Sequence, residues 1–202
     1  MIDTVILDLG NVLLEWDAAL AHPDLSREEH ARICQEIGFA DLNLRADAGE
    51  SWAALEAEVA TRHPRRAGFL AQYVAGFPAS IQSPVAGMPE LVAELRALGL
   101  RLIGLTNFSA ETYPVAPRVS PTVASLEAVV VSGEVGLIKP DPRIYRHLMR
   151  EHRVRPARSV FVDDRPENVF AAEALGMRGV VFTSAQALRV ELRAWGIEVA
   201  AG

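Results

Sequence analysis

The sequence has 202 residues, of which 50 % are hydrophobic and 23 % are charged, as in ordinary globular proteins. The net charge of −6 comes without long blocks of one sign, and no apolar run reaches the roughly 18 residues of a membrane-spanning helix. We therefore expect neither nucleic acid nor a membrane as a partner. One cysteine, Cys34, excludes an internal disulfide, and the N-terminus lacks the basic region of a signal peptide. These features predict a cytoplasmic protein.

The first strong element is the apolar run from Val5 to Leu7, which is followed at once by Asp8. A short unbroken run of this kind predicts a strand that is buried on both faces. From about residue 15 to residue 84 the composition changes to Ala, Glu, Arg and Leu, and no convincing strand is found. This stretch is therefore interpreted as a helical insertion.

Helix signals are clear within the insertion. Ser26 and Glu29 form a capping-box pattern, which predicts a helix starting at this point. Two more helices are expected over residues 51–62 and 65–75, and the second is expected to end at Gly76.

After residue 84 the pattern alternates between strands and helices. Helices are expected over 89–98, 142–152 and 166–175, and strands over 101–105, 128–131, 159–162 and 179–182. Such alternation is typical of parallel strands with helices on both faces. The prediction is an α/β fold: a Rossmann-like three-layer parallel-sheet core from residues 1–14 and 85–202, with an inserted α-helical cap at residues 15–84.

Polar residues follow three of the predicted strands. Asp8 follows the first strand, Thr106 and Asn107 follow the second, and Asp163 and Asp164 follow a later one. In open parallel sheets, ligands bind beyond the carboxyl ends of the strands, so these side chains can converge. Carboxylates held close together repel one another, and a divalent cation is the simplest way to stabilise them.

Four segments together resemble the motifs of the haloacid dehalogenase superfamily. They are, in chain order, Val5 to Val12 (Val-Ile-Leu-Asp-Leu-Gly-Asn-Val), Leu105-Thr106-Asn107, Lys139-Pro140, and Val160 to Asp164 (Val-Phe-Val-Asp-Asp). Their order over nearly the whole chain is similar to that of the subgroup with a helical cap between the first two motifs. The resemblance implies a phosphatase that acts on a small phosphorylated substrate.

The resemblance also implies a role for each matching residue. Asp8 is the expected nucleophile, which forms an aspartyl-phosphate. The Thr106 hydroxyl and the Asn107 backbone amide are expected to hold the phosphoryl oxygens. Lys139 is the expected catalytic point charge on the same oxygens, although a solvated loop lysine would be the ordinary interpretation.

Magnesium is the implied cofactor. Its expected ligands are the side chains of Asp8 and Asp164 and the backbone carbonyl of Gly10, with Asp163 nearby. Asn168, on the helix that follows, either orients these ligands or faces solvent, and the sequence does not decide between the two.

Gly10 departs from the family pattern, which usually has a second Asp at this position as general acid and base. Three hypotheses follow. The substrate has an easy leaving group, such as a sugar 1-phosphate; α-D-glucose-1-phosphate phosphatases have a similar Asp-Leu-Gly-Asn-Val motif. Alternatively, the protein is a metal-independent 2-haloacid dehalogenase, although the acidic pair at Asp163 argues against this, or it is a catalytically impaired module that binds a phospho-ligand.

The expected cap offers few specific signals. Arg45, Asp47 and Glu50 are candidates for substrate contacts, but surface salt bridges explain them equally well. Trp16 and Trp52 are candidates for the substrate side of the cap, but packing in the core is the expected role of both. The chain is expected to be a monomer or a homodimer.

Overall fold

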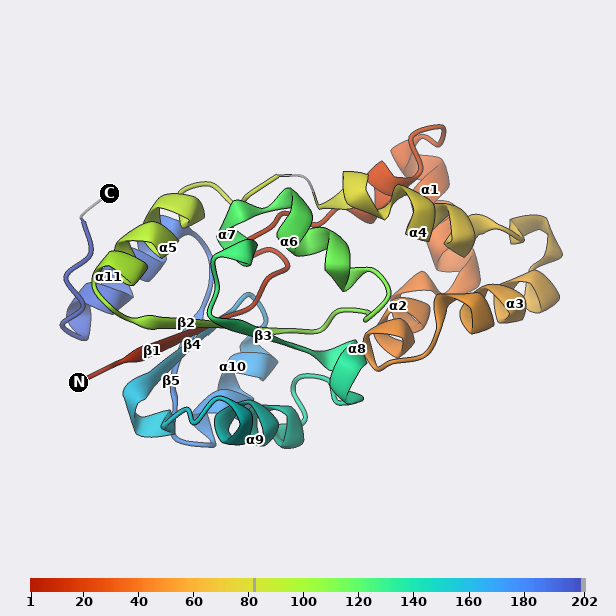
Figure 1. Cartoon of the computed structure of the whole chain (residues 1–202). Coiled ribbons are helices and arrows are strands. Elements are labelled where there is room, and N and C mark those ends of the chain that lie inside the picture. The colour runs from red at the N-terminus through yellow and green to blue at the C-terminus, as the bar shows by residue number, and fades with distance from the viewer. Residues whose placement is uncertain (82, 201–202) are drawn as a thin grey trace.

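The computed structural model describes residues 1–81 and 83–200 and contains a five-stranded parallel sheet (Figure 1). In space the strands follow the order β3-β2-β1-β4-β5. Their bounds are β1 Thr4–Leu7, β2 Arg101–Thr106, β3 Ala128–Val131, β4 Ser159–Asp163 and β5 Arg178–Val181. All strands predicted from the sequence are confirmed, with ends that shift by a residue or so.

Strand β1 lies at the centre of the sheet, and every one of its residues is buried. Ile6 is in register with Ile103 of β2 on one side and with Phe161 of β4 on the other. Because the strands are parallel, the residues that follow β1, β2 and β4 reach the same edge of the sheet. The register therefore brings Asp8 between the end of β2 and the end of β4.

Helices cover both faces of the sheet, as the alternating pattern predicts (Figure 1). One face packs against α5 Met88–Ala97, α6 Ala116–Val119, α7 Pro121–Ala124 and α11 Ala185–Ala194, and the other against α9 Pro142–Glu151 and α10 Pro166–Glu173. Two clusters of buried apolar side chains fill the two sides. The three-layer α/β prediction is confirmed.

Apart from isolated β-bridges at Gly10, Leu14 and Pro84, the regular elements that the structure describes between β1 and α5 are all helices. They are η1 Ala18–Ala21, α1 Arg27–Ile37, α2 Phe39–Asp47, α3 Trp52–Arg62, η2 Pro64–Arg66 and α4 Phe69–Ser80. These elements stand to one side of the sheet in Figure 1. The capping box of Ser26 and Glu29 is confirmed at the start of α1. Gln82, inside the predicted cap range of 15–84, lies outside the described residues, as do 201 and 202 of the predicted core.

The helix predicted to end at Gly76 was wrong in its bounds. Helix α4 starts later, at Phe69, and continues through Gly76 and Pro78 to Ser80. A Cβ atom at Gly76 would come within 2.1 Å of the backbone oxygen of Ala21 in η1. Glycine is needed here for close packing inside a helix, and the sequence signal for a helix end has the same residue type.

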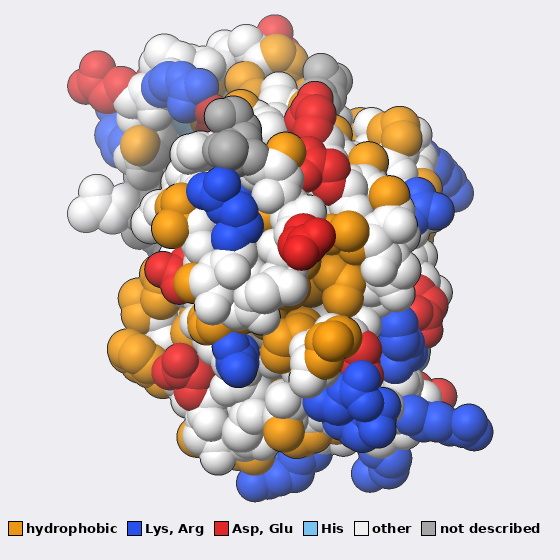
Figure 2. Space-filling model, turned by 90° about the vertical axis from the view of Figure 1, so that its left-hand side faces the viewer, with side chains coloured by type: hydrophobic (Ala, Val, Ile, Leu, Met, Phe, Trp, Pro, Cys, Tyr) orange, Lys and Arg blue, Asp and Glu red, His pale blue; other side chains and the backbone are white. Residues whose placement is uncertain are grey.

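The segment before Lys139 is partly helical. Directly after β3, Ser132–Val135 forms the short helix α8, which ends at Gly136. Over the described residues, no helix has the length and apolar character needed to cross a membrane. On the face shown in Figure 2, positive, negative and apolar side chains are interspersed.

Candidate active site

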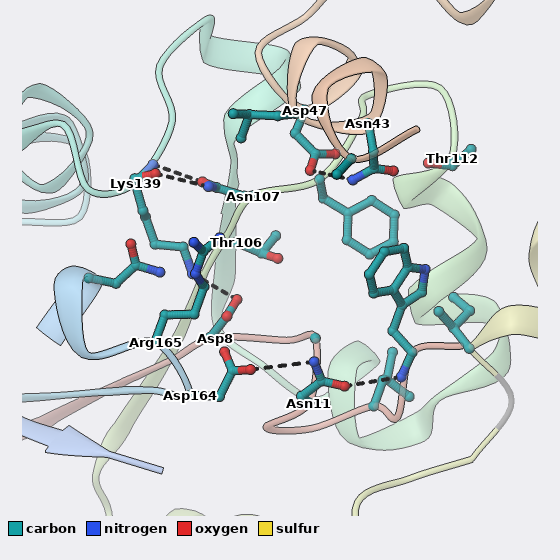
Figure 3. A pocket seen from close by; sticks show the side chains of 18 of the residues that line it. Asp8, Asn11, Asn43, Asp47, Thr106, Asn107, Thr112, Lys139, Asp164 and Arg165 are labelled. Carbon is teal, nitrogen blue, oxygen red and sulfur yellow. Dashed lines mark hydrogen bonds and ion pairs between the residues drawn. The ribbon is translucent and has the colours of Figure 1, made fainter. Parts of the chain in front are cut away.

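A pocket of about 300 Å³ lies at the carboxyl edge of the sheet, between the core and the inserted helices (Figure 3). One wall comes from the core and carries most of the charge. Its residues include Asp8, Gly10, Asn11, Thr106, Asn107, Lys139, Asp164, Arg165 and Asn168. The facing wall includes Trp16 and residues of α2 and α4: Ala40, Asn43, Leu44, Asp47, Tyr73 and Phe77.

Lys139 is the centre of the core wall and is buried, with 3 % of its surface exposed. Its Nζ lies 2.8 Å from Oδ1 of Asp8 and 2.6 Å from Oδ2 of Asp163, and it donates to the backbone oxygen of Leu105 at 3.0 Å. Three acceptors match the three N–H groups of an ammonium ion. Burial by itself would lower the pKa of Lys139, but the negative charges of Asp8 and Asp163 have the larger effect, so the pKa of the lysine is raised. The lysine is therefore a fixed cation.

Asp163 holds this arrangement together. Its Oδ2 accepts from Lys139, while its Oδ1 accepts from the backbone N–H of Arg165 and from Nδ2 of Asn168, both at 2.9 Å. Asn168 is 2 % exposed, so it faces the site and not solvent. Both oxygens of Asp163 are thus engaged by protein groups, which suits an anchor for Lys139 and for the start of α10.

The three aspartates predicted to surround a metal are brought together. One carboxylate oxygen each from Asp8, Asp163 and Asp164 lies within 4.8 Å of the other two. Burial raises the pKa of Asp8 to about 6 despite the charge of Lys139, and burial followed by the charge of Asp163 raises that of Asp164. Clustered carboxylates with raised pKa values are what Mg²⁺ would stabilise, and hard oxygen ligands are those it prefers. The donor set fits the predicted cation.

Asn11 completes this side of the site, although it was not among the residues predicted to form it. It has a left-handed backbone with φ of 56°, and its Nδ2 donates to Oδ2 of Asp164 at 3.4 Å (Figure 3). An asparagine tolerates this conformation better than most residues. Gly10 lines the pocket beside it, as predicted, and no heavy atom lies within 4 Å of where a Cβ would stand.

Thr106 and Asn107 lie where the sequence placed them, at the end of β2 and in the pocket wall. The side chain of Asn107 forms two bonds to the backbone of Lys139: its Oδ1 accepts from the N–H at 2.8 Å, and its Nδ2 donates to the carbonyl at 3.0 Å. This side chain therefore fixes the loop that carries the lysine, a role that the motif alone did not indicate.

The facing wall corrects one prediction. Trp16 was expected in the core, but it is 39 % exposed and lines the pocket, where it donates to the hydroxyl of Tyr73 at 3.3 Å. Trp52 is buried, as expected. Among the candidate polar residues of the cap, Arg45 forms ion pairs with Glu50 and Glu58 at 2.8 Å, as the salt-bridge interpretation holds. Asp47 is different, because it lines the pocket.

The comparison with known families agrees with this geometry. Residues 2–176 match the model of the haloacid dehalogenase-like hydrolases, a span that contains all the aspartates and the lysine described above. The chain belongs to the haloacid dehalogenase-like hydrolases. Its sheet, inserted helices and clustered aspartates are those that the motif resemblance implied.

Two curated relatives of this hydrolase are described as enzymes that act on phosphate esters. The sesquiterpene phosphatase astK of Aspergillus oryzae is 33 % identical over 54 % of this chain and 56 % of its own length. The flavin mononucleotide hydrolase 1 of Arabidopsis thaliana is 34 % identical over 56 % of this chain and 46 % of its own length. The match thus spans about half of each relative.

A solved structure shares the fold across nearly the whole hydrolase. A haloacid dehalogenase family enzyme from Bacteroides thetaiotaomicron, in complex with magnesium and inorganic phosphate, superimposes with a TM-score of 0.70. The similarity covers 91 % of this chain and 96 % of that one at 18 % identity. At this identity the likeness establishes the common architecture.

Proposed function

We propose that this hydrolase is a magnesium-dependent phosphatase that acts on small phosphate monoesters through an aspartyl-phosphate on Asp8. One observation carries the proposal: the Asp8 carboxylate is held by the buried Lys139 at the base of a pocket, beside two further carboxylates. The phosphatases among its relatives support the same reaction class.

Asp8 supplies the nucleophile in this proposal. The ion pair with Lys139 and the bond from the Leu9 backbone N–H at 2.7 Å both go to its Oδ1. These contacts fix the carboxyl group, so an oxygen can meet the phosphorus atom in line with the leaving oxygen. The positive charge of Lys139 also favours the negative charge that gathers on the phosphoryl oxygens.

Asp8, Asp164 and the Gly10 carbonyl are the proposed ligands for Mg²⁺, and Asn11 positions Asp164. When bound, the cation neutralises the phosphate and polarises its P–O bonds. Thr106 contributes a hydroxyl toward the phosphoryl oxygens from the end of β2. Asp163 acts through Lys139 and Asn168, since both of its oxygens are already bonded to the protein.

The apolar wall bears on the substrate. Trp16, Leu44, Tyr73, Phe77 and Phe108 give the pocket a large apolar and aromatic surface. Such a surface suits an alcohol with an apolar or flat body, and the face of a sugar ring also packs on aromatic side chains. A sugar 1-phosphate therefore stays a candidate substrate, and an aryl or benzylic phosphate is a second.

The acidic cluster separates a phosphatase from the alternatives. A dehalogenase of this superfamily needs no metal, and three clustered carboxylates would then have one cation, Lys139, among the described residues to offset their repulsion. An impaired binding module would not need a nucleophile held by a buried lysine. Both alternatives predict no release of phosphate that depends on Mg²⁺.

A substrate panel tests the proposal directly. Phosphate release is measured with glucose 1-phosphate, glucose 6-phosphate, phenethyl phosphate and p-nitrophenyl phosphate, each with Mg²⁺ and with EDTA. We expect turnover that EDTA abolishes and Mg²⁺ restores. Halide release from 2-chloropropionate that survives EDTA would establish the dehalogenase, and no phosphate release from any ester would establish the binding module. Faster turnover of glucose 6-phosphate than of glucose 1-phosphate would exclude the sugar 1-phosphate preference.

A further inference from the structure

Phosphoryl transfer from the phosphate ester of an ordinary alcohol releases an alkoxide, which needs a proton as the P–O bond breaks. The core wall has no acid to spare for this step among its described residues. All three N–H groups of Lys139 are donated, and both oxygens of Asp163 are engaged. Asp8 is the nucleophile and Asp164 is a proposed metal ligand. Position 10, a glycine, offers no side chain.

Three other titratable residues, Arg165, Tyr73 and Asp47, line the described part of the pocket, and the first two do not suit proton transfer. Arg165 pairs with Glu167 at 2.6 Å, and a guanidinium does not release its proton in proteins. Burial raises the pKa of the Tyr73 hydroxyl well above its usual value, and the charge of Asp47 raises it further. A phenol of this kind gives up its proton too reluctantly at neutral pH.

Asp47 remains, at the last turn of α2 in the facing wall. Figure 3 shows its carboxyl group and Asn43 on the opposite side of the pocket from Asp8 and Asp164. Nδ2 of Asn43 donates to Oδ2 of Asp47 at 3.1 Å, and the Ser109 backbone N–H also donates to the carboxyl group. Two neutral donors orient the group without neutralising it by an ion pair.

The backbone at this point is fixed to the core. The Ser132 hydroxyl donates to the carbonyl of Asp47 at 2.6 Å and accepts from the Phe108 N–H at 2.8 Å. Two residues later, a Cβ at Gly49 would lie 3.2 Å from the carbonyl of Gly133. The end of α2 therefore packs tightly on the start of α8, so the carboxyl group has a defined place over the site.

The surroundings of Asp47 also determine the pKa of its carboxyl group. Burial raises the pKa of Asp47 to about 7; the Ser109 N–H lowers it, the charge of Asp8 raises it, and that of Lys139 lowers it. Asp8, Lys139 and Tyr73 are the charged or titratable groups that this carboxyl group senses across the pocket. Near neutral pH the protonated and ionised forms are both present, as a group that gives and takes a proton requires.

We propose that Asp47 is a catalytic residue, the general acid and base of the reaction, supplied by the inserted helices. This inference rests on the proposed phosphatase function. In the first step an Asp8 oxygen bonds to phosphorus, the P–O bond to the alcohol breaks, and the proton of Asp47 passes to the alcohol oxygen. In the second step water attacks phosphorus, its proton passes to the Asp47 carboxylate, and the bond to Asp8 breaks. Ester and water become alcohol and phosphate, and Asp47 is restored.

Two substrates of similar body test the proton transfer. The leaving group of phenethyl phosphate is an alkoxide that needs a proton, whereas the leaving group of p-nitrophenyl phosphate is a stable phenolate. Because kcat/KM reports steps up to the loss of the alcohol, Asp47→Asn should lower it about 10²–10⁴-fold for the first ester and less than about 10-fold for the second. Asp41→Asn, on the same helix with a 76 % exposed side chain, is the matched control and should change neither value.

The kcat/KM for phenethyl phosphate divided by that for p-nitrophenyl phosphate gives a second readout, because ionisations that affect both reactions cancel in this ratio. For the wild type this ratio should fall above about pH 7, and for Asp47→Asn it should be flat. Equal losses on both esters, or no loss on phenethyl phosphate, would overturn the role of Asp47 alone. A wild-type protein that releases phosphate from neither of these esters nor from the glucose phosphates would overturn the phosphatase function and this inference with it.

Discussion

The two walls of the pocket differ in the charge they carry and in how they hold it. On the core wall, Lys139 and Asp163 are almost fully buried and every polar atom of theirs is bonded within the chain. On the facing wall, aromatic and aliphatic side chains surround one carboxyl group among the described residues, that of Asp47, and its hydrogen-bond partners are neutral. The core wall thus holds fixed charges in defined positions. The inserted helices contribute the apolar surface of the pocket and a carboxyl group that can give up a proton.

The largest expected effect comes from the nucleophile. Asp8→Asn keeps the shape of the side chain but removes the attacking charge, so phosphate release should fall by about 10⁴–10⁶-fold. The fold should persist, because Asn can still accept from Leu9. Phosphate release and thermal unfolding of the variant measure the two effects. Retained turnover would refute the assignment of Asp8.

Removal of the lysine should damage both stability and activity. Lys139→Met leaves Asp8 and Asp163 as close carboxylates without their cation, and breaking a buried pair costs about 3–5 kcal/mol. Urea unfolding should show a loss of this size. Arg45→Met is the control, because its ion pairs are partly exposed to solvent and should contribute much less to stability. Equal losses for the two variants would contradict a rigid core wall.

The proposed general acid can be moved from Asp47 on the facing wall to position 10 on the core wall. Since nothing lies within 4 Å of a Cβ at position 10, an aspartate fits there. In the Asp47→Asn background, Gly10→Asp should recover about 10-fold or more of the lost kcat/KM for phenethyl phosphate. Asn11→Asp in the same background is the control, and it should recover nothing because it faces Asp164. Equal recovery by both would show that any added charge suffices.

A pH-dependent change in stability is also expected. The pKa of Asp47 rises from 3.8 to about 7 on folding, so the wild type loses stability as pH rises through this window. Asp47→Asn lacks this penalty, and its free energy of unfolding should exceed that of the wild type by on the order of 4 kcal/mol at pH 8. Below pH 4 the two proteins should be equally stable. Urea unfolding at both pH values measures this, and an identical difference at each would contradict the proposed burial.

The contrast between the walls also explains what the sequence could predict. The strands were predictable because nearly continuous apolar runs are needed where both faces are buried, and the polar residues that follow such runs must meet at one edge. Lys139 could be selected through its motif, but its three acceptors come from separate strands and loops. Those contacts depend on tertiary structure, as does the choice between solvent and the site for Asn168.

The facing wall was harder to predict. Gly38 is both the C-cap of α1 and the N-cap of α2, so no side chain caps the start of α2. Asp47 could not be separated from Arg45 and Glu50 by residue type, because the difference lies in which neighbours the folded chain provides. Helix α11 was not predicted, although Ser184 caps it and accepts from the Ala187 N–H. That signal was available in the sequence.

The face of α2 that carries Asp47 also carries Ala40, Asn43 and Leu44, and all four line the pocket. Residues spaced three and four apart lie along one side of a helix, so a shift of α2 moves all of them together. A lineage that altered this helix to accept a new alcohol would also displace its proton donor. Substrate range and catalytic rate would then change together. In an enzyme with its acid at position 10, the inserted helices could change without displacing the proton donor.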